Sequence, residues 1–184
     1  MNIKELSQDY FLRDGTPVHI RAIRPDDKQR LLDGFHQLTR ESIYYRFFTH
    51  KHELTEKELQ FFTEVDFNYH VAIVADVPNT DGENDIGIGR YVEFKDKGGS
   101  KRVAEVAFAV AEEYQHLGVG SLLFKQLVLI AKNQGLSRLV AEVLLDNQGM
   151  LKILKRSGFK LEITKKKGVA HIEFDIDSSH EKVP

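Results

Sequence analysis

Two glycines in a short turn are the first residues whose type and spacing predict chemistry. The turn, Gln115-His116-Leu117-Gly118-Val119-Gly120, follows an apolar stretch that ends in two acids, and a helical pattern begins directly after it. Glycine lets a backbone approach a ligand without interference from a Cβ atom. The free N–H groups of a new helix, together with its dipole, favour an anion. The turn therefore predicts a site for a phosphate or a pyrophosphate.

One carboxylate interrupts the apolar run that precedes this turn. Glu105 lies within Val-Ala-Glu-Val-Ala-Phe, residues 103–108. A carboxylate is costly to bury without a partner, so Glu105 is either ion-paired, with Arg90 on the preceding strand as its partner, or kept for function. Burial would raise its pKa, which suits a general base. A lysine amine needs such a base, because its pKa near ~10.4 means that it must lose a proton before it attacks.

Three kinds of phosphate site can use such a glycine turn. A Walker loop needs Gly-Lys-Ser/Thr, but Gly120 is followed by Ser121 and no lysine. A dinucleotide site needs G-x-G-x-x-G after a strand of a parallel sheet, and both the spacing and the preceding antiparallel pattern differ. The third kind is an acyl-CoA site of the form Q-x-x-G-x-G, which the turn matches.

Two motifs in order resemble those of one enzyme family. Arg102–Lys125 resembles the acyl-CoA motif of the GNAT superfamily of N-acetyltransferases, and Asn147–Phe159 resembles the motif that follows it. The resemblance covers about residues 14–176. The stretches 23–27, 41–48, 89–91 and 104–108 are also similar to the acetyltransferase domain of Pat-type bacterial protein lysine acetyltransferases.

The resemblance implies an enzyme that transfers an acetyl group from acetyl-CoA directly to a primary amine of a protein lysine side chain. It implies a splayed central strand pair that holds the acyl-CoA, with Glu105 as the catalytic base. The implied cofactor-binding residues are Phe108 and Val110 beside the pantetheine arm, Gln115, Leu117, Gly118, Val119, Gly120 and Ser121 around the pyrophosphate, and Asn147 beside the CoA arm.

Two departures from the family pattern keep other functions open. The family often has a tyrosine as general acid where this chain has Leu154, and a Gly-Arg pair where this chain has His116-Leu117. Lys152, Lys155 or Arg156 could supply the missing positive charge. The alternatives are acetylation of a small-molecule amine, and an acyl-CoA-binding regulatory module without turnover. The retained Glu105 favours catalysis.

The elements that must position these residues follow from the periodicity. Apolar residues recur at helical spacing in segments that start at Pro25, Ser42 and Thr55, and the period changes to two from about Tyr69. We expect strands over 18–24, 69–75, 86–95, 102–111, 139–144, 159–164 and 169–176, with further helices over 118–133 and 146–157. This order predicts an α+β fold, a mixed and mostly antiparallel sheet flanked by helices.

The remaining segments are expected to connect or flank these elements in one domain over 1–184. Residues 1–13 read as a polar arm, 78–85 as a polar loop and 96–99 as a hairpin turn. The lysines at 165–167 precede Gly168 and also predict a hairpin turn. The polar tail from 177 is expected to fray.

Composition excludes several classes of function. The 26 basic residues against 28 acidic ones give a net charge of −2, which argues against nucleic acid as a partner. No cysteine occurs, so disulfides, thiolate metal sites and an acetyl-cysteine intermediate are excluded. His50 and His52 lack helical metal-ligand spacing, so no metal is expected. Without a signal core or an apolar run of ~20 residues, we expect a cytoplasmic protein that binds no membrane, as a monomer or homodimer.

Overall fold

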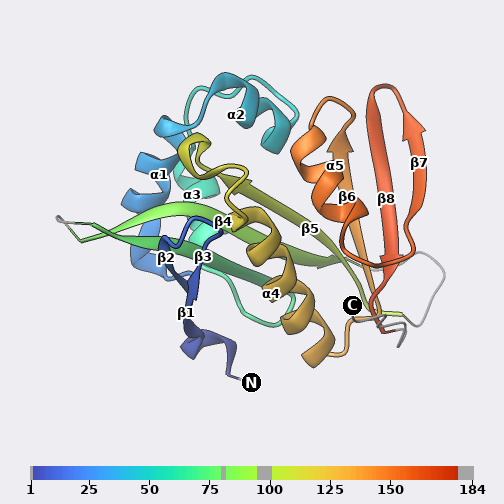
Figure 1. Cartoon of the computed structure of the whole chain (residues 1–184), viewed down its shortest axis with the longest axis horizontal. Helices are drawn as coiled ribbons and strands as arrows, with labels where there is room; N and C mark the ends of the chain where they lie inside the picture. The colour runs from blue at the N-terminus through green and yellow to red at the C-terminus, as the bar shows by residue number, and fades with distance from the viewer. Residues whose placement is uncertain (1, 80–81, 95–100, 178–184) are drawn as a thin grey trace.

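A single mixed sheet forms the centre of the molecule (Figure 1). A computed structural model describes residues 2–79, 82–94 and 101–177. Its eight strands are β1 (Ser7–Phe11), β2 (Pro17–Ala22), β3 (His70–Asn79), β4 (Gly82–Phe94), β5 (Val103–Val110), β6 (Arg138–Leu144), β7 (Glu162–Lys166) and β8 (Val169–Asp175). They lie in the order β1-β2-β3-β4-β5-β6-β8-β7, and every pair is antiparallel except β5 with β6.

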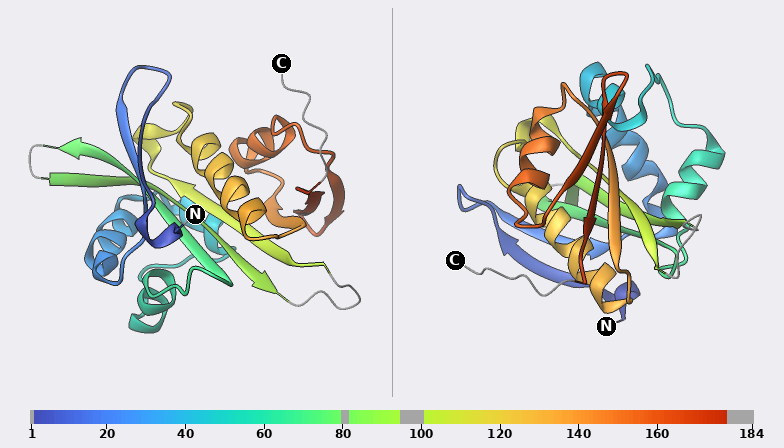
Figure 2. Two further views of the ribbon diagram at one scale, coloured as in Figure 1. Left: turned by 90° about the horizontal axis from the view of Figure 1, so that it is seen from below. Right: turned by 90° about the vertical axis from the view of Figure 1, so that its right-hand side faces the viewer.

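Helices cover both faces of the sheet (Figures 1 and 2). The α-helices are α1 (Lys28–Gln37), α2 (Arg40–Phe47), α3 (Glu56–Thr63), α4 (Val119–Asn133) and α5 (Gln148–Lys155), and short 3₁₀ helices span Ile3–Glu5, Pro25–Asp27 and Glu112–Tyr114. The first three helices form one layer with their own apolar cluster, and α4 and α5 pack in the main core on the opposite face. This arrangement confirms the expected α+β sheet flanked by helices. No helix in the described ranges is long and apolar enough to span a membrane.

Local signals account for most of the element boundaries. The Thr55 hydroxyl accepts from the Glu58 N–H and the Glu58 carboxylate accepts from the Thr55 N–H, so the predicted capping box starts α3. The Thr39 hydroxyl caps α2 by accepting from the Ser42 N–H, so this helix begins at Arg40 and not at Ser42. The lysine turn is confirmed, since Lys167 and Gly168 both have positive φ between β7 and β8.

The N-terminal segment is not the polar arm that its composition predicts. Ser7–Phe11 forms β1, which pairs with β2 along its whole length. The strand is almost entirely exposed, so it has no apolar face that could have revealed it in the sequence. Ile3, Leu6 and Leu12 on either side of it are buried in the main core and hold it in place.

The predicted polar loop at 78–85 is also wrong. β3 runs to Asn79 and β4 begins at Gly82, so strand pairing continues through these polar residues. Backbone hydrogen bonds stabilise this hairpin, and they leave no mark on side-chain polarity. The expected turn at 96–99 and most of the C-terminal tail lie outside the described residues.

Candidate active site

The two central strands separate after three residue pairs. β5 pairs with β6 only at Val103↔Arg138, Ala104↔Leu139 and Glu105↔Val140. Beyond Glu105, β6 stays with β8 as far as Leu144, while β5 continues beside β4. The expected splayed strand pair is therefore present, as the divergence of β5 and β6 in Figure 1 shows. Its last paired residue on β5 is Glu105.

The opening exposes the backbone of the second half of β5. The Ala111 N–H donates to the Ile86 carbonyl at 2.9 Å. In an antiparallel pair every second residue forms hydrogen bonds with the same neighbouring strand, so the backbone N–H and C=O groups of Ala109 and Ala107 also face β4. Those of Phe108 and Val110 consequently face the opening. The Gln115 side-chain amide donates to the Val110 carbonyl at 3.2 Å and satisfies one of them.

The glycine turn ends where α4 begins. Gly118 has φ +108°, a left-handed conformation that favours glycine, and no side chain caps the helix. The first helical bond runs from the Leu122 N–H to the Gly118 carbonyl at 3.0 Å, so the amides of the first turn have no acceptor within the helix. A Cβ on Gly120 would lie 2.8 Å from Ile153 Cδ1, so the turn packs tightly against α5. The start of α4 can therefore hold an anion.

A groove with a volume of about 610 Å³ joins the turn to the opening between the strands. This volume lies in the range of small-molecule and cofactor sites. Seven of the nine predicted cofactor residues line it: Phe108, Val110, Gln115, Gly118, Gly120, Ser121 and Asn147. Leu117 and Val119 do not line the groove. The Val119 side chain is fully buried and the Leu117 side chain packs against the core, so only their peptide groups belong to the turn.

Basic side chains border the groove. Lys152 and Arg156 line it, and Lys155 is exposed outside it. Arg13 lines it too. This residue was not predicted, because it belongs to the segment whose composition indicates a polar arm. The Arg13 N–H donates to the Leu117 carbonyl at 3.3 Å, which fixes the residue beside the glycine turn. Arg13, Lys152 and Arg156 thus place positive charge along the groove.

Helix α2 forms one wall of the groove. The hydroxyls of Thr39 and Ser42 each donate to Glu112 Oε1 at 2.5 Å, which ties α2 to the end of β5. Burial opposes ionisation of Glu112, but these hydrogen bonds hold its pKa below the ordinary value. On the other side the Tyr45 hydroxyl contacts the Asp146 carbonyl at 3.3 Å. The wall is thus fixed to both sides of the opening.

Asn147 and Leu154 lie on α5. The Asn147 side chain accepts from the Met150 N–H at 3.0 Å, so it caps the helix as well as lining the groove. Leu154 stands where the family often has a tyrosine. Its side chain has no hydroxyl group and is fully buried. Tyr45 is the tyrosine among the groove-lining residues.

Glu105 lies at the last paired position before the strands separate. Ala104 and Val106 are buried in the core beneath α4, so Glu105 lies on the opposite face, toward α1–α3. Its predicted burial is wrong, because the side chain is exposed at the mouth of the opening. No ion pair with Arg90 forms among the described residues. The register places Glu105 opposite Val92, and Arg90 turns toward His70.

Comparisons with known proteins agree with this geometry. A family profile described as Acetyltransferase (GNAT) family matches residues 33–159. The chain is 33% identical over 167 residues to Acetyltransferase Pat of Mycolicibacterium smegmatis, which covers 90% of this chain and 47% of that protein. The chain thus spans about half the length of this relative.

Solved structures share the fold. The GNAT domain of S. lividans PAT is 33% identical and superposes with a TM-score of 0.82, covering 92% of this chain and 97% of that one. The yncA protein of Salmonella typhimurium, solved with acetyl-CoA, is 15% identical with a TM-score of 0.68, covering 89% and 96% of the two chains. At that identity, the likeness concerns the fold alone.

Proposed function

Because the chain belongs to the GNAT acetyltransferase family, we propose that it transfers an acetyl group directly from acetyl-CoA to a protein lysine side chain, with Glu105 as general base. The observation that carries the proposal is the position of Glu105, an exposed carboxylate at the point where β5 and β6 separate. The groove runs from the anion site at α4 to Phe108 and Ala109, three and four residues past Glu105 on the same strand.

The cofactor-binding residues divide by chemistry. The pyrophosphate is assigned to the first-turn amides at Gly118–Ser121, including the peptide groups of Leu117 and Val119, with Gln115 holding the end of β5. The pantetheine amides are assigned to the backbone of Phe108 and Val110, which faces the opening, and the arm passes Asn147. The groove residues fit this ligand because they combine free amides, cations and an exposed strand edge.

The transfer needs one proton acceptor and one site for negative charge. Glu105, directly or through a water, takes one proton from the ammonium group, and the neutral nitrogen attacks the thioester carbonyl carbon. The nitrogen then releases a second proton to solvent. A backbone N–H of the Phe108–Val110 segment is assigned to the oxyanion. The C–S bond breaks, and the CoA thiolate takes its proton from solvent. The chain has no cysteine, so the acetyl group passes to the amine in one step.

An assay of CoA release tests the proposal. The cysteine-free chain gives no background with a thiol reagent, so with cysteine-free acceptors the whole signal is CoA. We expect release with lysine-containing proteins together with a mass increase on lysine. Release with small amines alone would support the small-molecule alternative. Release no faster than in buffer with any acceptor would reject the enzyme and leave an acyl-CoA-binding module.

A further inference from the structure

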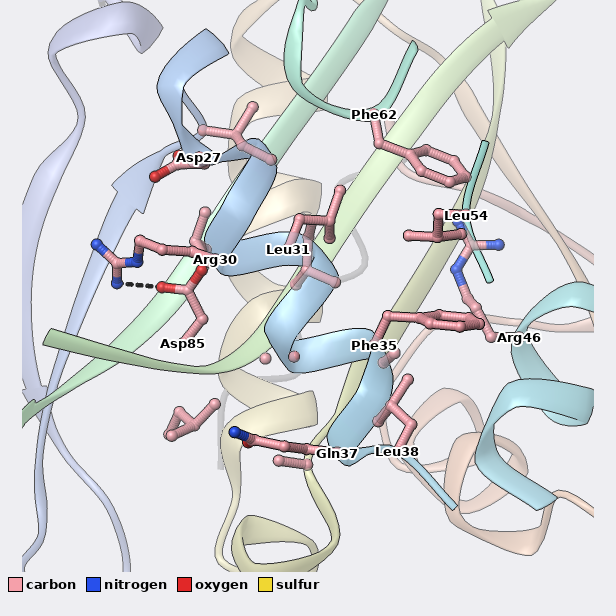
Figure 3. Close-up of a pocket in the computed structure, with 18 of the residues that line it drawn as sticks. Asp27, Arg30, Leu31, Phe35, Gln37, Leu38, Arg46, Leu54, Phe62 and Asp85 are labelled. Carbon is pink, nitrogen blue, oxygen red and sulfur yellow. Dashed lines mark hydrogen bonds and ion pairs between the residues drawn. The ribbon is translucent and has the colours of Figure 1, made fainter. Parts of the chain in front are cut away.

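A second cavity lies between the α1–α3 layer and the sheet (Figure 3). Its volume is about 80 Å³, and most of its wall is apolar, with Leu31, Phe35 and Phe62 among the lining residues. Arg46 and Ala109 line both this cavity and the acyl-CoA groove. The cavity therefore adjoins the groove at these two residues.

Charges at one end of the cavity neutralise one another. Arg21 donates to Asp27 at 2.7 and 2.9 Å and to Asp76 at 2.7 Å, and Arg30 pairs with Asp76 at 3.0 Å and with Asp85 (Figure 3). Burial and the neighbouring Asp76 raise the pKa of Asp85. Two arginines at this end face three aspartates, and each arginine has at least one carboxylate partner.

The other end holds a buried cation with no carboxylate partner. Arg90 is only 5% exposed, and no carboxylate of the described residues lies within ion-pair distance. Its Nη1 contacts His70 Nε2 at 3.2 Å and the Phe62 carbonyl at 3.4 Å, and its guanidinium lies 4.4 Å from the Phe62 ring centroid. Burial and Arg90 lower the pKa of His70 to about 4, so all these partners are neutral at pH 7.

Arg46 adds a second cation at the same end. Its side chain points toward Leu54 and Phe62 (Figure 3). Burial lowers the pKa of Arg46, and the Glu105 carboxylate acts against that shift. Arg46 in turn lowers the pKa of Arg90, after burial itself. Glu105 therefore opposes the charge of Arg46 only, and the two arginines together carry an excess positive charge.

An unpaired buried arginine is costly in free energy, and replacing a buried charge with an apolar side chain is often neutral or stabilising. Stability alone therefore does not account for a cation at position 90. A guanidinium is suited to bind a carboxylate with two parallel hydrogen bonds. A volume of about 80 Å³ exceeds the ~10–15 Å³ that one water molecule needs, so the cavity can hold a small polar group such as a carboxylate.

We propose that Arg46 and Arg90 form a binding site for a carboxylate carried by a reacting molecule, either at the end of a dicarboxylic acyl chain on CoA or on the amine acceptor. The inference rests on the proposed function, because acyl transfer brings both molecules to this end of the groove. It extends the donors or acceptors beyond the acetyl group and plain amines.

Equilibrium binding to the full chain tests the site. Malonyl-CoA is compared with isovaleryl-CoA, which has the same shape without the charge. With CoA bound, β-alanine is compared with β-alaninamide. We expect the carboxylate form to bind about 10- to 100-fold more tightly in one of the two comparisons, as a charged hydrogen bond provides. Arg90→Met should abolish that preference, and the matched control Arg40→Met, at an exposed position, should retain it.

The two comparisons identify the source of the carboxylate. A preference only for malonyl-CoA assigns the site to the donor, and one only for β-alanine assigns it to the acceptor. Equal binding in both comparisons, or a preference that survives Arg90→Met, overturns the proposal. A large loss of stability in Arg90→Met without any ligand preference in the parent chain overturns it too, since Arg90 is then structural. Acetyl transfer is not measured here, so a failure of the proposed function shows separately as absent CoA release.

Discussion

Gly120→Ala tests how closely the glycine turn is fitted to α5. The added Cβ would lie 2.8 Å from Ile153 Cδ1 and 3.4 Å from Phe108 Cε2. Overpacking typically costs ~1–3 kcal/mol, and alanine in a helix returns roughly 0.5–1 kcal/mol relative to glycine. We therefore expect the free energy of unfolding to fall by about 1 kcal/mol. The first-turn amides move with the helix, so acetyl-CoA affinity should fall about tenfold.

Urea unfolding and equilibrium binding measure both effects, and Ile153→Val isolates their cause. That substitution removes the Cδ1 atom, so Gly120→Ala should cost about 1 kcal/mol less in its presence than in the parent chain. Gly34→Ala in α1 is the matched control, because no atom lies within 4 Å of its added Cβ, and it should stabilise the chain. If Gly120→Ala also stabilises the chain and leaves acetyl-CoA binding intact, the close packing and its role in the cofactor site are refuted.

Two further predictions concern charges. Arg13→Met should weaken acetyl-CoA binding about 5- to 10-fold and reduce the salt dependence of that binding. Lys155→Met, outside the groove, should do neither. Titrations at two salt concentrations measure both, and equal effects of the two substitutions would show that Arg13 is not part of the site. The pKa of His70 is lowered to about 4, by burial first and by Arg90 second, so its neutral form is favoured in the folded chain. This stabilisation is complete above pH ~6.5 and is lost as the pH falls toward 4, by roughly 3 kcal/mol in all. His70→Gln should abolish this part of the pH dependence of the free energy of unfolding, measured with urea. His52→Gln, at an exposed position, should retain it. An unchanged pH dependence in His70→Gln would contradict the assigned pKa.

Local sequence signals were sufficient for the framework of the site. The glycine turn, the strand before it and the helix after it follow from neighbouring residues, and the structure has all three. The splayed strands came from the resemblance, because a missing strand pair leaves no trace in composition. The cap at Thr55 was also readable, since both of its partners lie within three residues.

Features that depend on distant contacts could not be read from the sequence. Glu105 was expected to be buried because its neighbours are apolar, but a position where two strands part is open to solvent on one face. Arg13 joins the groove only because β1 pairs with β2 and carries the residue to the glycine turn. The Arg46–Arg90 cluster combines a helix with a strand that lies more than forty residues later.

Turnover of Glu105→Gln tests the central claim most directly. General-base catalysis contributes ~10²–10⁴-fold, so kcat at neutral pH should fall by that factor while the Kd for acetyl-CoA stays the same. The rate of the variant should rise with pH as the amine loses its own proton, toward its pKa near ~10.4. A variant that keeps the parent turnover and pH profile would contradict the assignment of Glu105 as the base.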